Sequence, residues 1–418
     1  MRIVHIGPAS DGTVLHRFGG AVERRMMELA RCQTARGRSV LVYSTGPAVE
    51  TRYVDGVEVR FLRCAAPYAI RHVEFLFRAL QDLRTRQERP DVLHFHGQPE
   101  GAVLSRGLTG VKVLSYDSFY FKRGREAPLG ALYRRWLQRF DWLLPCSRYC
   151  LDESTAYWEL PLDHVRLVYN GVNLEQFRPD PAAGASERAA RGITSPIVLY
   201  VGRVCAQKGT HVLLNAFRRI SRRRKDLQLV LAGPIEQFAS RASPAAWQAR
   251  IAEVGGHYLG AVDEDRLASV YRMADIYVLP TVRFEMFGMA AVEAQACGVP
   301  VIASDHAGLR ETVPFSSGGR FPVGDDAALA ERIEQLLDDD ALRRSCAANG
   351  ALYARQFAWP VICDTLDPIY DGTQLRPACL EEARLPGSWR DLFGERRSTR
   401  RLHQPAKKQV IPPKPEAT

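Results

Sequence analysis

The chain has 418 residues, of which 46% are hydrophobic and 25% charged, and its formal net charge is +10. A chain of this length is too long to fold around one ordinary hydrophobic core, which predicts two domains with a tail. The composition is that of a globular protein, so neither half needs disulfides or a metal to fold. The positive charge fits nucleic acid, anionic lipid or phosphate-rich substrates, and its location has to decide among them.

Nine cysteines are scattered without paired spacing, and no histidine group completes a zinc ligand set around Cys146 and Cys150. We therefore expect reduced structural thiols and a cytoplasmic protein. The sequence enters directly into an apolar run at residues 3–6, without the leader of a signal peptide. No apolar run approaches the roughly 20 residues of a membrane helix, so no membrane span is predicted.

Short apolar runs alternate with helix-like segments through residues 1–177, which predicts an N-terminal α/β domain with a parallel sheet. The predicted strands are residues 3–6, 39–43, 57–62, 92–95, 111–114, 142–144 and 165–168. Residues 178–196 are rich in Pro, Ala and Gly and are predicted to be a linker.

The same alternation restarts and predicts a second α/β domain over residues 197–355. Its strands are expected at residues 197–201, 227–232, 257–259, 276–279, 301–303 and 319–323. Two Rossmann-like, doubly wound domains of this kind face a cleft. A helix-like run from Asp339 to about Tyr370 is broken at Pro360, and residues 372–418 form an extension with a basic tail that we expect to be disordered.

Residues 281–311 carry the strongest functional signal. An apolar strand is followed by a loop with Glu285, a helix from about Gly288 and a second apolar strand. In such a unit ligands bind at the carboxyl ends of strands and anions at the amino ends of helices. The free amides of Gly288, Met289 and Ala290 are therefore expected to hold a diphosphate.

Glu293 lies about 1.5 turns into the same predicted helix and is placed to reach a ribose diol beyond the diphosphate, while Glu285 meets the sugar. The alternative is that Glu293 is a partly buried structural carboxylate and Glu285 a solvated loop residue. Two glutamates at this spacing do not decide between these alternatives. The surrounding stretch does, because it reads E-x-F-G-x-x-x-x-E-A-x-A-x-G-x-P-V-I-A-S.

This stretch resembles glycosyltransferase family four. The resemblance implies a retaining enzyme of two facing α/β domains (the GT-B fold) that moves a sugar from a nucleotide diphosphate, with Glu293 on the ribose and Glu285 on the transferred sugar. It also implies that residues 356–371 are a closing helix that returns to the N-terminal domain. UDP- or GDP-linked sugars are the expected donors, and no cofactor is expected.

Two cations follow the first strand of the second domain, in the order G-R-x-x-x-x-K-G. Arg203 and Lys208 are expected to stabilise the leaving diphosphate beside Gly202, because fixed positive charges act where negative charge develops. The alternative is that Arg203 and Lys208 are solvated surface cations. In the first domain, Gly19 and Gly20 precede a helix and resemble the family's G-G-x-x-x-R entry, which places Gly20 at the donor from across the cleft.

Acceptor-side candidates lie at the ends of two N-terminal strands. His94 and His96 share one face of their strand, and each is either a group in the cleft or a satisfied core histidine. Tyr116 and Asp117 end the next strand, where the family usually has a histidine. Either Tyr116 supplies a hydroxyl in its place or His96 takes over, and the sequence leaves both alternatives open.

The acidic run Asp263-Glu264-Asp265 suits the start of a helix better than a metal site, so a metal-independent enzyme is expected. A basic region of the first domain is either a solvated face or a peripheral contact with an anionic membrane, on its inner surface. It comprises Lys122, Arg123, Arg125, Arg134, Arg135 and Arg139. No nucleic-acid motif accompanies it.

The predicted function is sugar transfer to a hydroxyl of a saccharide, a lipid-linked glycan or a small metabolite. The alternatives are a nucleotide-sugar epimerase or phosphorylase, and a non-catalytic protein that binds nucleotide sugar. The sequence does not identify the base, the sugar or the acceptor.

Overall fold

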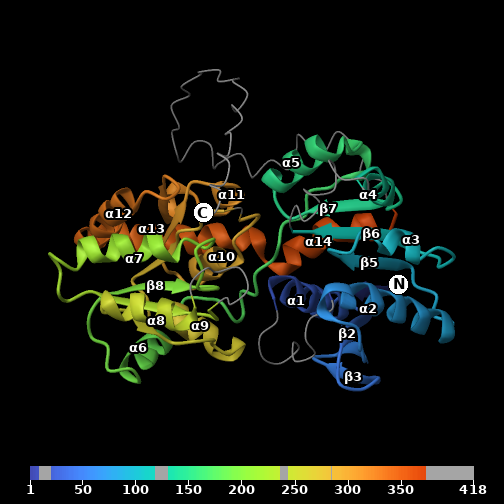
Figure 1. Ribbon diagram of the computed structural model, residues 1–418, viewed down its shortest axis with the longest axis horizontal. Helices are drawn as coiled ribbons and strands as arrows, with labels where there is room; N and C mark the ends of the chain where they lie inside the picture. The colour runs from blue at the N-terminus through green and yellow to red at the C-terminus, as the bar shows by residue number, and fades with distance from the viewer. Residues whose placement is uncertain (9–19, 118–129, 236–242, 284, 373–418) are drawn as a thin grey trace, which may run out of the picture. The chain divides into compact units, whose positions relative to one another are not determined.

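The computed structural model describes residues 1–418 except residues 9–19, 118–129, 236–242, 284 and 373–418. The described chain forms two parallel α/β sheets, one in each half (Figure 1). This confirms the predicted class of fold. The extension and basic tail predicted at residues 372–418 lie almost wholly outside the described residues.

The N-terminal sheet has seven strands in the order β3-β4-β2-β1-β5-β6-β7. All neighbours are parallel except β3 and β4. The strands are β1 Arg2–Ile6, β2 Ser39–Thr45, β3 Glu50–Val54, β4 Val57–Leu62, β5 Val92–His96, β6 Val111–Tyr116 and β7 Trp142–Pro145. The helices of this half are α1 Ala21–Ala35, α2 Tyr68–Thr85, α3 Gly101–Leu104, α4 Gly130–Leu137 and α5 Arg148–Trp158.

The C-terminal sheet has six parallel strands in the order β10-β9-β8-β11-β12-β13. They are β8 Ile197–Val201, β9 Gln228–Ala232, β10 His257–Tyr258, β11 Ile276–Leu279, β12 Val301–Ser304 and β13 Gly318–Phe321. The helices are α6 Pro181–Ala189, α7 Thr210–Ile220, α8 Pro244–Glu253, α9 Glu264–Arg272, α10 Met289–Ala296, α11 Leu309–Thr312, α12 Asp326–Asp338 and α13 Asp340–Ala354.

The final helix, α14 (Trp359–Tyr370), packs on the N-terminal half although it follows the C-terminal sheet in sequence. Figure 1 shows it beside α1. Trp359, Ile362 and Leu366 are buried in one apolar cluster with Ile3 of β1 and Leu29 of α1. Pro360 lies in the first turn of α14, where a missing N–H costs no helical hydrogen bond, so the helical break falls just before it.

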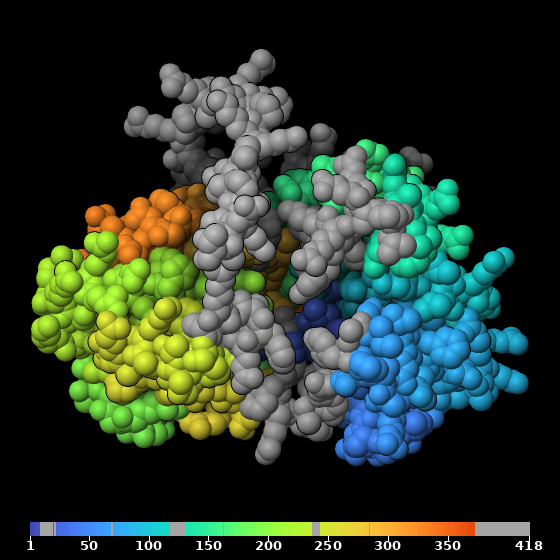
Figure 2. All heavy atoms as spheres, viewed as in Figure 1, coloured from blue at the N-terminus to red at the C-terminus, as the bar shows by residue number. Residues whose placement is uncertain are grey.

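Three segments differ from the sequence-based prediction. Residues 165–168 make an isolated bridge between Val165 and Leu143 instead of a strand, although the amides of Arg166 and Val168 still donate to the Leu143 and Pro145 carbonyls at 3.0 and 3.1 Å. The predicted linker contains α6, which Asp180 caps through the Ala183 amide and which starts at Pro181. Strand β3 was not predicted because its side chains are largely exposed and show no apolar run. It ends the sheet order beside β4, and the blue residues of this part of the chain lie at the lower periphery of the view in Figure 2.

Candidate active site

The C-terminal sheet reverses its strand order beside β8, whose neighbours are β9 and β11. Open parallel sheets bind ligands at such a point, beyond the carboxyl ends of the strands. The loops after β8 and β11 are joined there, because the amides of Val282 and Arg283 donate to the Gln207 carbonyl at 3.1 and 3.2 Å. At Gly209 a Cβ atom would lie 1.7 Å from the Pro280 carbonyl oxygen, so only glycine allows this approach.

An ion pair links these two loops. Lys208, just before α7, donates to the carboxylate of Glu285 in the loop after β11. Both side chains are about one-fifth exposed, at 22% and 17%. The backbone of Glu285 is held as well, because its carbonyl accepts from the Gly308 amide at 3.0 Å. The structure therefore brings Lys208 and Glu285 together, with each charge compensated by the other.

Helix α10 begins immediately after this loop. Its N-cap is Gly288, which has a φ of +87°, and a Cβ atom there would lie 2.5 Å from Cδ2 of Leu309. Glycine is therefore required both for the backbone and for the close packing. Met289 and Ala290 are the first helical residues, so their amides have no acceptor within the helix and the helix dipole makes them a site for an anion.

Glu293 is 3% exposed on α10, and both of its oxygens have protein partners. The Tyr271 hydroxyl donates to one oxygen at 2.9 Å, and Arg24 of α1 donates to the other at 2.7 Å. Burial, and then the Glu293 charge, raise the pKa of Tyr271 well above its usual value, so the phenol stays protonated and acts as a donor. The carboxylate is fixed in orientation by these two bonds.

Gly202 and Arg203 directly follow β8, and the Arg203 carbonyl accepts from the Tyr200 hydroxyl at 2.7 Å. The Arg203 side chain is exposed beside the same loop as Lys208. In the N-terminal half, Gly20 is exposed at the N-cap of α1, and its carbonyl accepts from the Arg24 amide at 3.1 Å. Gly19 lies outside the described residues.

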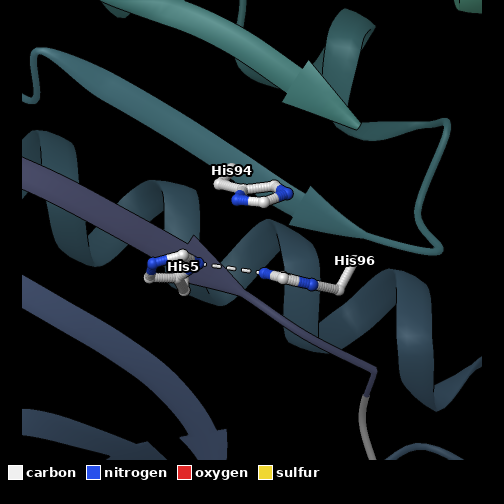
Figure 3. A group of neighbouring side chains, drawn as sticks. All are labelled: His5, His94 and His96. Atoms are coloured by element: carbon white, nitrogen blue, oxygen red, sulfur yellow. Dashed lines mark hydrogen bonds between the residues drawn. The ribbon is translucent and has the colours of Figure 1, made fainter. Parts of the chain in front are cut away.

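Both histidine candidates of β5 are buried, and they join a third histidine of β1 (Figure 3). His5 lies between Gln33, at 2.7 Å from Nε2, and His96, at 3.0 Å from Nδ1. His94 bonds to the Tyr370 hydroxyl at 2.6 Å and the Ser115 hydroxyl at 2.7 Å. Its two ring nitrogens are thus both satisfied, as in a core histidine.

These hydrogen bonds determine which ring nitrogens carry a proton. The Gln33 carbonyl oxygen accepts from His5 Nε2, so His5 Nδ1 accepts from His96 Nε2. His96 Nδ1 is then an unprotonated acceptor, and it is buried without a hydrogen-bond partner among the described residues. Burial lowers the pKa of all three imidazoles, that of His5 to about 4, which keeps them neutral.

Among the described residues, this trio is the group whose ligand atoms lie close enough to hold a metal ion, all within 4.8 Å of one another. Each nitrogen of His5 and His94 already has a protein partner. The rings of His94 and His96 are also stacked, with centroids 4.2 Å apart, so they do not converge on one point. The geometry is that of a hydrogen-bonded core network.

Tyr116 is 4% exposed and packs against α5, where its hydroxyl bonds to the Ser154 hydroxyl at 2.8 Å. This places the phenol in the core. Asp117 extends beyond the strand, and its carboxylate pairs with Arg25 of α1. Of the two residues at this turn, Asp117 is the more accessible, with 22% of its side chain exposed.

The acidic residues 263–265 lie at the start of α9, the position that their sequence favours. Asp263 is the N-cap residue, and Glu264 and Asp265 occupy the first turn. In the predicted basic region, Arg134 pairs with Glu159, and Arg135 lines a cavity of about 430 Å³ between α4 and α5. Lys122, Arg123 and Arg125 lie outside the described residues.

Three residues at these sites were not predicted to have a role. Tyr271 and Arg24 hold Glu293, and Glu311 accepts from the Arg148 and Tyr149 amides at 2.7 Å each, which satisfies the start of α5. Arg24 stands in the G-G-x-x-x-R entry, which was the available signal for it. Tyr271 and Glu311 act across long sequence separations and carry no local pattern.

Two family models of known proteins match this chain. The model of "Glycosyltransferase Family 4" matches residues 18–176, and that of "Glycosyl transferases group 1" matches residues 186–352. A phosphatidyl-myo-inositol mannosyltransferase of Mycobacterium leprae is 28% identical over 367 residues, 84% of this chain and 93% of that protein. A D-inositol 3-phosphate glycosyltransferase of Xylanimonas cellulosilytica is 31% identical over 57% of this chain and 58% of its own length.

Solved structures agree in fold. Sucrose-phosphate synthase from Thermosynechococcus elongatus superposes with a TM-score of 0.73 and 22% identity, over 89% of this chain and 99% of that one. Anabaena HepE in complex with UDP-glucose has a TM-score of 0.70 and 17% identity, over 89% and 100%. The fold, with two α/β domains that each contain a parallel sheet, is therefore the GT-B fold.

Both halves of the chain are matched by glycosyltransferase models, and the chain belongs to the family-four glycosyltransferases. It is accordingly an enzyme of the transferase class, and its family uses nucleotide-sugar donors. The chain spans about half the length of several inositol phosphate glycosyltransferases that it matches. Among the described residues, no helix is both long and apolar enough to cross a bilayer.

Proposed function

We propose that the protein transfers a sugar, with retention of anomeric configuration, from a UDP- or GDP-linked donor to a hydroxyl acceptor. The observation that carries this proposal is that α10 begins at the loops that follow β8 and β11, where the strand order reverses. The helix offers Met289 and Ala290 amides to a diphosphate, and Glu293 lies further along for the ribose.

Donor binding exchanges partners within the site. Lys208 turns from Glu285 to the diphosphate, which frees Glu285 to orient the sugar hydroxyls. Glu293 keeps the hydrogen bond from Tyr271, releases Arg24 and accepts from the ribose hydroxyls instead. Lys208, Glu285 and Glu293 each exchange one hydrogen bond for another in this way.

In the transfer step, the bond between the anomeric carbon and the diphosphate oxygen breaks while the acceptor oxygen attacks from the same face. The departing diphosphate takes the acceptor proton. Arg203, Lys208 and the α10 amides stabilise the negative charge that develops on it. This arrangement requires no metal ion, since fixed cations and amides occupy the position where the charge appears.

The relatives' names support an acceptor with an inositol ring that is phosphorylated or part of a phospholipid, and free inositol is a third form to test. Peripheral contact with an anionic membrane belongs to the lipid form of this proposal. Product analysis with myo-inositol, an inositol phosphate and phosphatidylinositol vesicles distinguishes the three, and the anomeric proton coupling of the product reports retention.

Calorimetric binding of UDP, GDP and ADP, with and without a chelator, tests the donor site. We expect metal-independent binding of one nucleotide and a loss of about 10- to 100-fold in Glu293→Gln, which removes the charge but keeps the shape. Glu331→Gln, an exposed glutamate of α12, is the matched control. No binding, binding only with metal, or an equal loss in both variants would contradict the assignment.

A further inference from the structure

Two thiols meet where the last helix packs on the first. Cys363 of α14 is 1% exposed, and Cys32 of α1 is partly exposed at the rim of the same apolar cluster. Both cysteines are reduced in the structure, and their side chains share a hydrogen bond. This contact joins positions far apart in the sequence within the N-terminal half of the molecule.

Arg36, one turn after Cys32, is the cation beside this pair, and it is itself paired with Asp364 and Asp367 of α14. Its guanidinium donates to Asp367 at 2.8 Å and to the Pro360 carbonyl at 2.6 Å, and it also hydrogen-bonds to the Cys32 sulfur. The hydrogen bond from the Cys363 thiol, aided by Arg36, lowers the pKa of Cys32 to about 7. A partly exposed sulfur of this kind is a thiolate in a large fraction of molecules near neutral pH.

A second cysteine pair among the described residues provides a contrast. Cys146 and Cys150 are buried, at 1% and 0% exposure, and the hydrogen bond between them, with burial, raises the pKa of Cys146 well above its usual value. A buried protonated thiol reacts slowly with oxidants. Of the two pairs, only Cys32 and Cys363 combine an accessible thiolate with an adjacent resolving thiol.

We propose that Cys32 and Cys363 form a site of reversible oxidation, at which a peroxide converts the two thiols into a disulfide that fastens α14 to α1. The Cys32 thiolate attacks one oxygen of hydrogen peroxide, forming a sulfenic acid and releasing hydroxide. The Cys363 thiol then attacks the sulfenic sulfur, forming the S–S bond and releasing water. Two thiols lose two electrons, and one peroxide becomes two waters.

The bond has a structural consequence because α14 is the segment that returns from the C-terminal sheet to the N-terminal one. Residues 32 and 363 are 331 positions apart (363 − 32), so the disulfide closes most of the chain into one loop. Closing a long loop restricts the unfolded chain and raises the melting temperature. The first helix, which carries Gly20 and Arg24, is then covalently held to the last.

The test uses the full chain, reduced and then treated with hydrogen peroxide at pH 7.5. Free thiols are blocked with N-ethylmaleimide, and non-reduced peptides are mapped by mass spectrometry. We expect a Cys32–Cys363 peptide as the main cross-link and a rise of several degrees in Tm, both reversed by dithiothreitol. Cys32→Ser abolishes both effects. Cys346→Ser, on α13, is the matched control and keeps both.

Three outcomes overturn the proposal: no cross-link, oxidation of Cys32 to a sulfinic acid with Cys363 unreacted, or a link from Cys32 to Cys379, which lies outside the described residues. A measurement on the unmodified chain is independent of how the variants fold. Iodoacetamide labelling of reduced Cys32 is expected to reach half its maximal rate near pH 7, and near a higher pH in Arg36→Gln. A midpoint close to the usual thiol value in the unmodified chain also overturns it.

Discussion

The two sheets of this protein reverse their strand order at equivalent points, and the two points are chemically opposite. Beside β8 and β11 the residues are charged and partly exposed, with Lys208 paired to Glu285. Beside β1 and β5 they are neutral and buried, with His5, His94 and His96 in one hydrogen-bonded network. The charged residues of the first point suit an anion, whereas the histidines of the second bond mainly to one another and to core residues.

This contrast shows that topology locates a crevice without assigning its chemistry. Both sheets present strand ends and helix starts to the same kind of opening. In the C-terminal half, Gly209 and Gly288 let the backbone approach closely and leave helix amides for a ligand. In the N-terminal half, Tyr370 of the returning helix satisfies His94 from the other end of the chain. Side chains from distant segments decide which site stays open.

The largest expected effect is on stability in acid. The folded pKa of each histidine in the network is lowered from the usual 6.5, so the unfolded chain binds more protons below that pH. Stability from these groups is complete above pH 6.5 and falls as the pH drops toward 4. Each neutral histidine contributes a slope of up to about 1.4 kcal/mol per pH unit, or roughly 4 kcal/mol for three.

Thermal unfolding followed between pH 7.5 and 5 measures this slope. His5→Gln is expected to reduce it by about a third. His72→Gln, an exposed histidine of α2, is expected to leave it unchanged. Equal slopes in all three proteins would mean that the N-terminal network is not neutral, and the comparison between the two crevices would fail.

Removing the cation from the C-terminal crevice should abolish most of the activity. Lys208→Ala is expected to lower kcat/KM by roughly 10³-fold, about 4 kcal/mol, because the role we propose for this lysine is to stabilise charge on the leaving diphosphate. Initial rates of donor consumption with acceptor provide the measurement. Lys225→Ala, at an exposed turn of the same half, is the control. A loss of less than tenfold in Lys208→Ala would show that another group carries this role.

Gly288→Ala is expected to destabilise the C-terminal half by about 2 kcal/mol, through the strain of a positive φ and the contact with Leu309. Gly324→Ala separates these causes, since Gly324 has a similar φ of +81° and open space around it. Its expected cost is about 1 kcal/mol, from strain alone. Urea unfolding measures both variants, and equal costs would mean that the packing at Gly288 is unimportant.

The smallest effect is expected for Tyr116→Phe, which removes the hydroxyl bonded to Ser154. A buried hydrogen bond of this kind contributes about 1 kcal/mol, and kcat should stay within twofold. Ser154→Ala, which removes the other partner, should behave alike. A hundredfold loss of kcat in Tyr116→Phe alone would instead give Tyr116 the role of the family's usual histidine.

Local sequence determined most of the fold. Apolar runs of strand length give β8, β11 and β12 within a residue of their observed ends, because fully buried parallel strands are apolar throughout. The start of α10 follows from Gly288, since a left-handed residue before a helix favours glycine. The exposed edge strand β3 and the helix α6 escaped prediction because partial exposure leaves no clear apolar period.

The sequence by itself identified Lys208, Glu285 and Glu293 as site candidates, because each stands in an ordered local motif beside a predictable strand end. Only the tertiary structure decided how their charges are compensated and whether a buried polar residue is open or closed. His94 and Tyr116 read alike as strand-end candidates, yet Tyr370 and Ser154 satisfy them in the core. Such partners come from segments distant in the chain, and a hydrogen bond between distant residues produces no periodic pattern in the local sequence of either residue.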